Sequence, residues 1–165
     1  APRAACDLSR TLAFQRVDTQ FRRDTFCAEG VVEILEHDLE RYLDDDGRRL
    51  LTWVTQYRSR TTTESTVERN RSRESLGASV EREAVSDSGE LPELFAVVAP
   101  VYRDPMVATV RVVGVDVHLD LKNQQFRLIP READLESASD KARRQIRDIL
   151  REAATGVVVC GGGPQ

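Results

Sequence analysis

Segment 113–122, VGVDVHLDLK, alternates between apolar side chains and glycine or polar side chains. A period of two places the two sets on opposite faces of a β-strand. The apolar set consists of Val113, Val115, Val117, Leu119 and Leu121. We expect this strand to cover 106–121 and to turn at Asn123 and Gln124 into a second strand over 125–129. The pattern therefore predicts a β-hairpin with one apolar face.

A first helix is predicted over 24–47. Apolar residues recur there at three- and four-residue intervals from Phe26 to Leu43. Asp24 is suited to cap the start of this helix, and Gly47, which follows three aspartates, is suited to cap its end.

A second helix is predicted over 134–154, with one apolar stripe and charged residues on the rest of its surface. The stripe consists of Leu135, Ala138, Ala142, Ile146, Ile149, Leu150 and Ala153. It extends over about five turns. We expect this stripe to cover the apolar face of 113–121.

Other segments favour strands by residue type. In 50–60, LLTWVTQYRSR, side chains alternate and aromatic residues are frequent. Residues 94–102 are apolar on both faces, which is typical of a central strand. Residues 61–74 are polar and rich in β-branched side chains, which indicates an exposed strand or hairpin, and 157–160 fit a short last strand.

Together these elements predict an α+β fold in a single domain over 1–165. We expect an antiparallel β-sheet of about five to seven strands with two main helices packed against it. Residues 1–20 are expected to form an N-terminal arm, 58–83 a polar β-hairpin extension and 161–165 a flexible tail.

Composition narrows the class of protein further. The chain is 32% charged with a net charge of −4, which argues against a dedicated nucleic-acid binder but permits a local basic patch. No apolar run approaches the roughly 20 residues of a membrane helix, and the N-terminus lacks the apolar core of a signal peptide. We therefore expect a cytoplasmic protein that does not enter a membrane. Cys6, Cys27 and Cys160 form no CxxC pair, so neither a zinc site nor a disulfide framework is indicated.

Asp116, His118 and Asp120 share the polar face of the first predicted strand, with about 6.5 to 7 Å between neighbours. Carboxylate and imidazole groups at that spacing suit a metal ion, which is one hypothesis for this face. A metal ion needs further ligands, and the other histidine, His37, lies on a predicted helix. Lys122 flanks the row. We favour a solvated face with ion pairs and predict no metal.

Motifs for nucleophilic or metal-assisted catalysis are missing from the sequence. It contains no GxSxG, no HExxH and no cysteine beside a credible histidine partner. We predict no catalytic residues and no cofactor, and expect that the protein is not an enzyme.

Arginines on the predicted strands allow a nucleic-acid interpretation. The candidates are Arg58, Arg60, Arg69, Arg71 and Arg73. A row of this kind can hold phosphates, and Trp53 and Tyr57 can stack on bases. Glutamates interleave with the arginines, so cross-strand ion pairs explain the pattern equally well, and aromatic residues at period two are typical of a core.

Assembly is the interpretation that we favour. A polar hairpin over 58–83 would bury little apolar surface to offset its ordering, and the edges of a sheet need to be covered. Self-association would meet both needs. We therefore expect a homo-oligomer, or a complex with another protein.

Three segments of the chain carry a family resemblance. The first is ELPELFAVVAPVYRDP, 90–105, with matching positions at Pro92, Phe95, Pro100, Val101 and Tyr102. The others are the polar segment STVERNRSRESLGASVEREAV, 65–85, and the tail REAATGVVVCGGGP, 151–164. Together these segments resemble the YfdQ-like proteins of phages and prophages, a family with a domain of unknown function.

The resemblance covers roughly 61–165, and its motifs are mostly structural residues. It implies a phage or prophage origin, a bacterial host cytosol, and a host or phage protein as a further possible partner. The family has no established catalytic residues to carry over.

Overall fold

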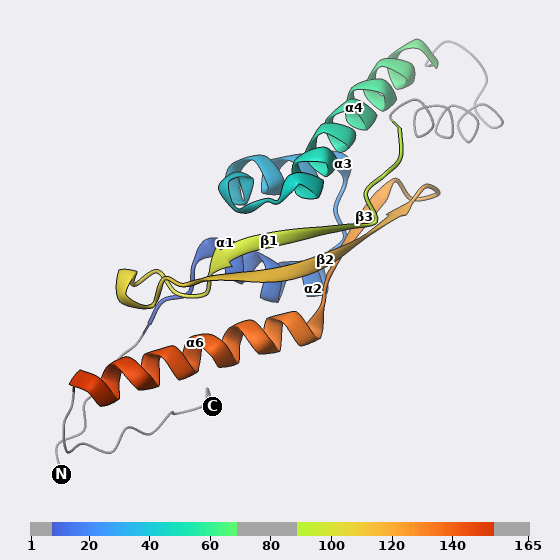
Figure 1. Cartoon of the computed structure of the whole chain (residues 1–165). Coiled ribbons are helices and arrows are strands. Elements are labelled where there is room, and N and C mark those ends of the chain that lie inside the picture. The colour runs from blue at the N-terminus through green and yellow to red at the C-terminus, as the bar shows by residue number, and fades with distance from the viewer. Residues whose placement is uncertain (1–7, 69–88, 154–165) are drawn as a thin grey trace.

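The computed structural model describes residues 8–68 and 89–153, and it confirms the α+β class (Figure 1). The strands are β1 (Leu94–Pro100), β2 (Val110–Asp120) and β3 (Gln125–Pro130). The helices are α1 (Leu12–Gln15), α2 (Phe21–Arg23), α3 (Ala28–Glu33), α4 (Asp45–Glu68) and α6 (Glu132–Ala153). The shorter segments are the π-helical η1 (Arg16–Gln20) and η2 (Ile34–Asp38), and the 3-10 segments η3 (Glu40–Tyr42) and η4 (Pro105–Val107).

The predicted hairpin is confirmed, but the predicted number of strands is wrong for the described residues. They form one antiparallel sheet of three strands in the order β1-β2-β3. Val98 lies opposite Val112 between β1 and β2, and Val117 lies opposite Leu128 between β2 and β3. Residues 69–88 and 154–165, which include the last predicted strand over 157–160 and the predicted tail over 161–165, lie outside the described residues.

Helix α4 replaces a predicted strand. Residues 50–60 are helical, and the helix continues to Glu68, so the predicted β-hairpin over 58–83 is wrong for 58–68. Its buried residues Leu50, Trp53, Val54 and Tyr57 have the three- and four-residue spacing of a helix face. The period of two that we saw in this segment comes from β-branched and aromatic residues, and packing of the helix against the sheet outweighs their strand preference.

The acidic run before α4 begins a helix, contrary to our expectation that it ends one. The Asp44 carboxylate accepts a hydrogen bond from the backbone N–H of Gly47 at 2.8 Å, which satisfies a donor in the first turn. Asp45 and Asp46 then lie in the first turn of α4, where negative charge is favoured by the helix dipole. The expected capping role of Gly47 at a helix end is therefore wrong.

The N-terminal region is also more helical than predicted. Residues 12–23 form a helical segment where we expected an arm, because the Thr11 hydroxyl accepts from the Phe14 N–H at 3.2 Å and caps its start. The helix predicted over 24–47 is shorter: α3 begins at Ala28 after an extended Cys27, and Asp24 lies at the C-terminal end of α2 instead of capping the start of a helix. Cys27 is a free cysteine and is exposed.

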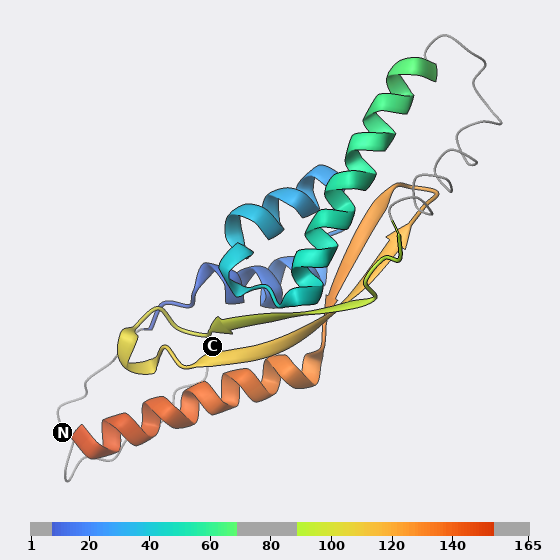
Figure 2. The same ribbon diagram turned by 45° about the horizontal axis from the view of Figure 1, so that its top comes forward.

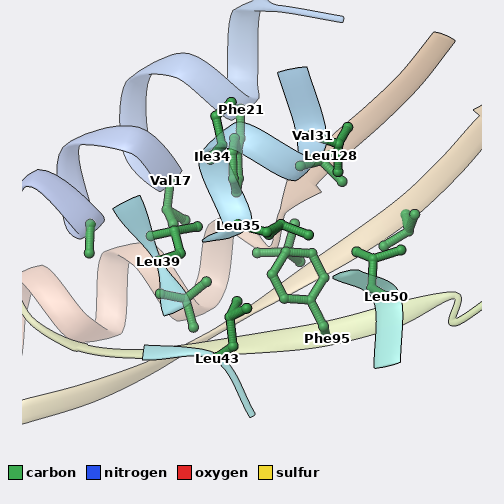
Figure 3. Packing of buried hydrophobic residues seen from close by; sticks show 14 of the residues in the cluster. Val17, Phe21, Val31, Ile34, Leu35, Leu39, Leu43, Leu50, Phe95 and Leu128 are labelled. Carbon is green, nitrogen blue, oxygen red and sulfur yellow. The ribbon is translucent and has the colours of Figure 1, made fainter. Parts of the chain in front are cut away.

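The helices α1 to α4 all lie on one face of the sheet, which we call the inner face (Figures 1 and 2). Its strand residues are buried: Phe95, Val97, Ala99, Val113, Val115, Val117, Phe126 and Leu128. Figure 3 shows side chains from the helices, including Val17, Leu35 and Leu39, packed towards Phe95 of β1. The apolar face of β2 is therefore buried as predicted.

Helix α6 is confirmed, and the first part of its stripe, Leu135, Ala138 and Ala142, joins the core on the apolar side of β2, but α1 to α4 cover most of that face. It follows β3 directly and runs alongside β2, on the side away from β1 (Figures 1 and 2). The pairing of β3 with β2 ends at Val115, and the start of α6 takes over the hydrogen bonds of the next residue, Gly114. The Gly114 N–H donates to the Asp134 carboxylate at 3.0 Å, and the Gly114 carbonyl accepts from the Arg131 N–H at 2.8 Å. Leu135 is among the few α6 residues that are fully buried.

An aromatic cluster joins α4 to the hairpin. Trp53 and Tyr57 stack with ring centroids 5.3 Å apart, and both meet Phe126 of β3 edge to face, at 6.3 and 6.0 Å. The Trp53 indole N–H donates to the carbonyl of Gly89 at 3.0 Å. Trp53 and Tyr57 thus belong to the core, and Phe126 has no exposed surface.

We expect Phe126→Ala to lower the free energy of unfolding by about 4 kcal/mol, because it removes the ring on which Trp53 and Tyr57 rest and leaves a cavity. Urea unfolding followed by circular dichroism measures this loss. The control is Met106→Ala, at a side chain that is 70% exposed, which should change the free energy by less than about 0.5 kcal/mol. Equal losses in the two variants would contradict this account of the core.

Candidate interaction surface

The face of the sheet opposite α1 to α4, which we call the outer face, is not covered by any helix of the described ranges 8–68 and 89–153. In Figure 1 its strands lie in front of α1 and α2. By the alternation along each strand it carries two sets of residues. The apolar part consists of Leu94, Ala96, Val98, Pro100, Val110 and Val112. The charged part, towards the β2–β3 turn, includes Asp116, His118, Asp120 and Arg127.

The apolar part of the outer face has large side chains in contact with water. Leu94 is 37% exposed, Val110 is 50% exposed and Val112 is 60% exposed. Val98 lies directly opposite Val112, so the apolar side chains of β1 and β2 form a continuous surface. Contiguous apolar surface of this kind on a folded protein marks an interaction site more often than single exposed residues do.

The middle of the outer face has small strand residues that are covered by side chains from the start of α6. Ala96 of β1 lies opposite Gly114 of β2, so neither strand raises a large side chain there. A methyl group at Gly114 would lie 3.1 Å from Cδ of Arg131 and from Oδ2 of Asp134, closer than ordinary van der Waals contact. Glycine is therefore required where the first turn of α6 meets β2.

Asp116 and Asp120 hold partners within the protein. The Arg131 guanidinium donates to the Asp116 carboxylate at 3.1 Å. Asp120 accepts hydrogen bonds from the backbone N–H groups of Lys122 and Asn123 and from the Asn123 side chain. These contacts support the interpretation of a solvated face with ion pairs, in which the carboxylates fix the hairpin turn and the start of α6.

The three residues of the hypothetical metal site share the outer face, but they are not gathered around one point. Within the described part of the chain, no group of three histidine, cysteine, aspartate or glutamate side chains is arranged to hold a metal ion. His118 is exposed and lies opposite Arg127, whose positive charge opposes cation binding. His37 is exposed on η2, in the helical layer on the other side of the sheet.

The predicted arginine row is not brought together on a strand. Arg58 and Arg60 lie on α4, where two positions correspond to about 200° around the helix axis, so their side chains leave in different directions. Arg69, Arg71 and Arg73 lie outside the described residues.

Sequence reasoning missed the outer face for a specific reason. We interpreted the two apolar sides of 94–102 as those of a central strand covered on both faces, whereas β1 is an outermost strand of the described sheet and is covered on one. The available signal was that Val110 and Val112 are apolar on the same side as Asp116.

Among the described helices, none is long and apolar enough to cross a membrane.

We expect the pKa of Asp120 to lie below its ordinary value because the Asn123 amide donates to its carboxylate at 2.7 Å, with further help from backbone N–H groups. Asn123→Ala should raise this pKa towards the ordinary value of about 3.9. Carboxyl carbon NMR titration measures it. Since the folded-state pKa is lowered, the ionised group stabilises the fold above the ordinary pKa, and this contribution is lost as the pH falls through the folded-state pKa.

The control for this titration is Gln125→Ala, which removes a neighbouring exposed amide and should leave the pKa of Asp120 unchanged. An unchanged pKa in Asn123→Ala would show that the turn contacts do not set it.

Comparison of the chain with models of protein families, with curated proteins and with solved structures found no match. The resemblance to the YfdQ-like family therefore stays a prediction.

Proposed function

We propose that the protein acts by homo-oligomeric assembly, in which the outer face docks on the same face of a second copy. The observation that carries this proposal is the exposure of Val110 and Val112, which lie opposite Pro100 and Val98 on the outer face. Burying such surface stabilises an interface by about 25 cal/mol for each Å² of apolar area removed from water.

The edges of the sheet are occupied, which favours docking through the face. Phe26 pairs with Phe126 on the free side of β3 through two backbone hydrogen bonds of 2.8 and 2.7 Å. On the free side of β1, the Asp44 N–H donates to the Ala96 carbonyl at 3.2 Å, and the Thr11 hydroxyl donates to the Pro100 carbonyl at 2.6 Å. A strand added by another molecule would have to displace these contacts.

A second copy is the occupant that best fits the chemistry of the outer face. Two sheets that each carry one apolar face pack about 10 Å apart, and the paired Val98 and Val112 supply such an apolar area on the outer face. The charged part carries both signs, with Asp116 paired to Arg131 and His118 beside Arg127. Two identical faces related by a two-fold axis therefore do not meet as surfaces of one charge.

The proposal includes a non-enzymatic role. The resemblance to YfdQ-like proteins supports a phage or prophage origin and a place in the bacterial host cytosol, with a host or phage protein as the alternative occupant of the outer face. Two observations weigh against the metal and nucleic-acid alternatives: the described residues hold no cluster suited to a metal ion, and Arg58 and Arg60 lie on α4 and not on a strand.

We expect the native protein to be a dimer or a larger oligomer that persists at high salt, because apolar contact is screened little by ions. Val112→Asp should weaken the association by at least about a hundredfold, since a two-fold interface buries the unpaired charge twice. Sedimentation equilibrium and light scattering measure the native mass, and the ratio of absorbance at 260 and 280 nm reports bound nucleic acid.

The matched control is Gln56→Glu, which adds one negative charge on an exposed position of α4 away from the outer face. It should leave the native mass unchanged. A monomeric wild-type protein, or an equal loss of mass in both variants, would contradict assembly through the outer face. A particle that contains nucleic acid and dissolves with added salt would also contradict it.

A further inference from the structure

A groove of about 420 Å³ lies between α6 and the start of β2, outside the outer face and the residues proposed for assembly. Its strand side is formed by Thr109 and Arg111, and its helix side includes Lys141, Arg144 and Gln145. The volume falls within the range of about 300 to 1,000 Å³ that is common for small-molecule sites.

The guanidinium of Arg111 in this groove has fewer hydrogen-bond acceptors than N–H donors. Its Nη2 donates to Oε1 of Gln145 at 3.3 Å, while its Nε is buried without a hydrogen-bond partner. A guanidinium has five N–H donors, and a buried donor without an acceptor costs free energy. An oxyanion in the groove would accept from the free end of the guanidinium and balance its charge.

Two more cationic side chains, both from α6, line the groove with Arg111. Lys141 and Arg144 line the same groove, one turn apart, and neither forms an ion pair with the described residues. Lys141 and Arg144 lie in the middle of α6, whereas the helix dipole acts in the first and last turns. The dipole does not account for their convergence with an arginine from β2.

We propose that this groove binds a compact ligand that carries a phosphate group, held by Arg111, Lys141 and Arg144. Three cations around one phosphate allow paired and charge-assisted hydrogen bonds, which are the strong ones. The groove supplies Thr109 and Gln145 as further polar groups for the rest of the ligand.

The acidic residues of the groove limit the length of the ligand. Asp148 and Glu152 line it one and two turns beyond Arg144, about 6 and 12 Å along the helix. A nucleic-acid strand carries a phosphate about every 3.4 Å along the duplex axis, so its next phosphates would meet these carboxylates. The same groove therefore favours one phosphate, or two adjacent ones, over a polyanion.

The test uses pyrophosphate and inorganic phosphate as probes on the full chain, by isothermal titration calorimetry at constant ionic strength in chloride. We expect saturable binding with one site per chain. Arg144→Gln should weaken it about tenfold, which is the effect of losing one charge-assisted contact. Arg111→Gln should weaken it at least as much, and circular dichroism checks that this half-buried position still allows folding.

The control is Arg147→Gln, which removes the same charge from an exposed position of α6 that does not line the groove. Its affinity for pyrophosphate should equal that of the wild type. Equal losses in Arg147→Gln and Arg144→Gln, or no saturable binding above chloride, would overturn the site. Tighter binding of a 20-nucleotide single strand, with a steep dependence on salt, would overturn the compact ligand in favour of nucleic acid.

Discussion

The backbone pairing of Phe26 with Phe126 is the contact on which the rest of the structure depends. It fixes the segment between α2 and α3 to the free side of β3 through two hydrogen bonds. A three-stranded sheet is close to the smallest that is stable alone, and it needs a layer packed against it. The pairing holds that layer in place, and it positions Phe126 under Trp53 and Tyr57 of α4.

The same arrangement makes the fold one-sided. The chain before β1 forms helices that cover the inner face, and its extended residues Thr11, Phe26 and Asp44 occupy both edges of the sheet. The Arg22 guanidinium of α2 also pairs with Glu132, which ties the helical layer to the start of α6. Water is thereby excluded from the inner face and from the edges, while the outer face keeps its apolar side chains exposed.

The sequence allowed the hairpin and α6 to be predicted because each has a long, uninterrupted period. Val113 to Leu121 repeat every second residue, and Leu135 to Ala153 repeat every third or fourth. Helix α4 could not be predicted in the same way, because Thr52, Val54 and Thr55 have high strand preference within an apolar pattern that also fits a helix. Its state is decided by contacts with Phe126, more than 60 residues away in the chain, which no local pattern contains.

The position of α6 likewise depends on a contact that periodicity does not reveal. An apolar stripe indicates that a helix is buried on one side, but it does not indicate which element the helix packs against. Asp134 accepts from the Gly114 N–H, the donor that a longer β3 would have engaged, and this hydrogen bond starts the helix beside β2.

With its first turn fixed there, α6 runs along the edge of β2 and leaves Val110 and Val112 uncovered. One carboxylate in the first turn of α6 thus places the helix along the groove near Arg111 and away from the outer face of the sheet. The two surfaces that we propose to be functional therefore share a structural cause, although they differ in chemistry: one offers exposed valines for docking, and the other is concave and lined by three cations.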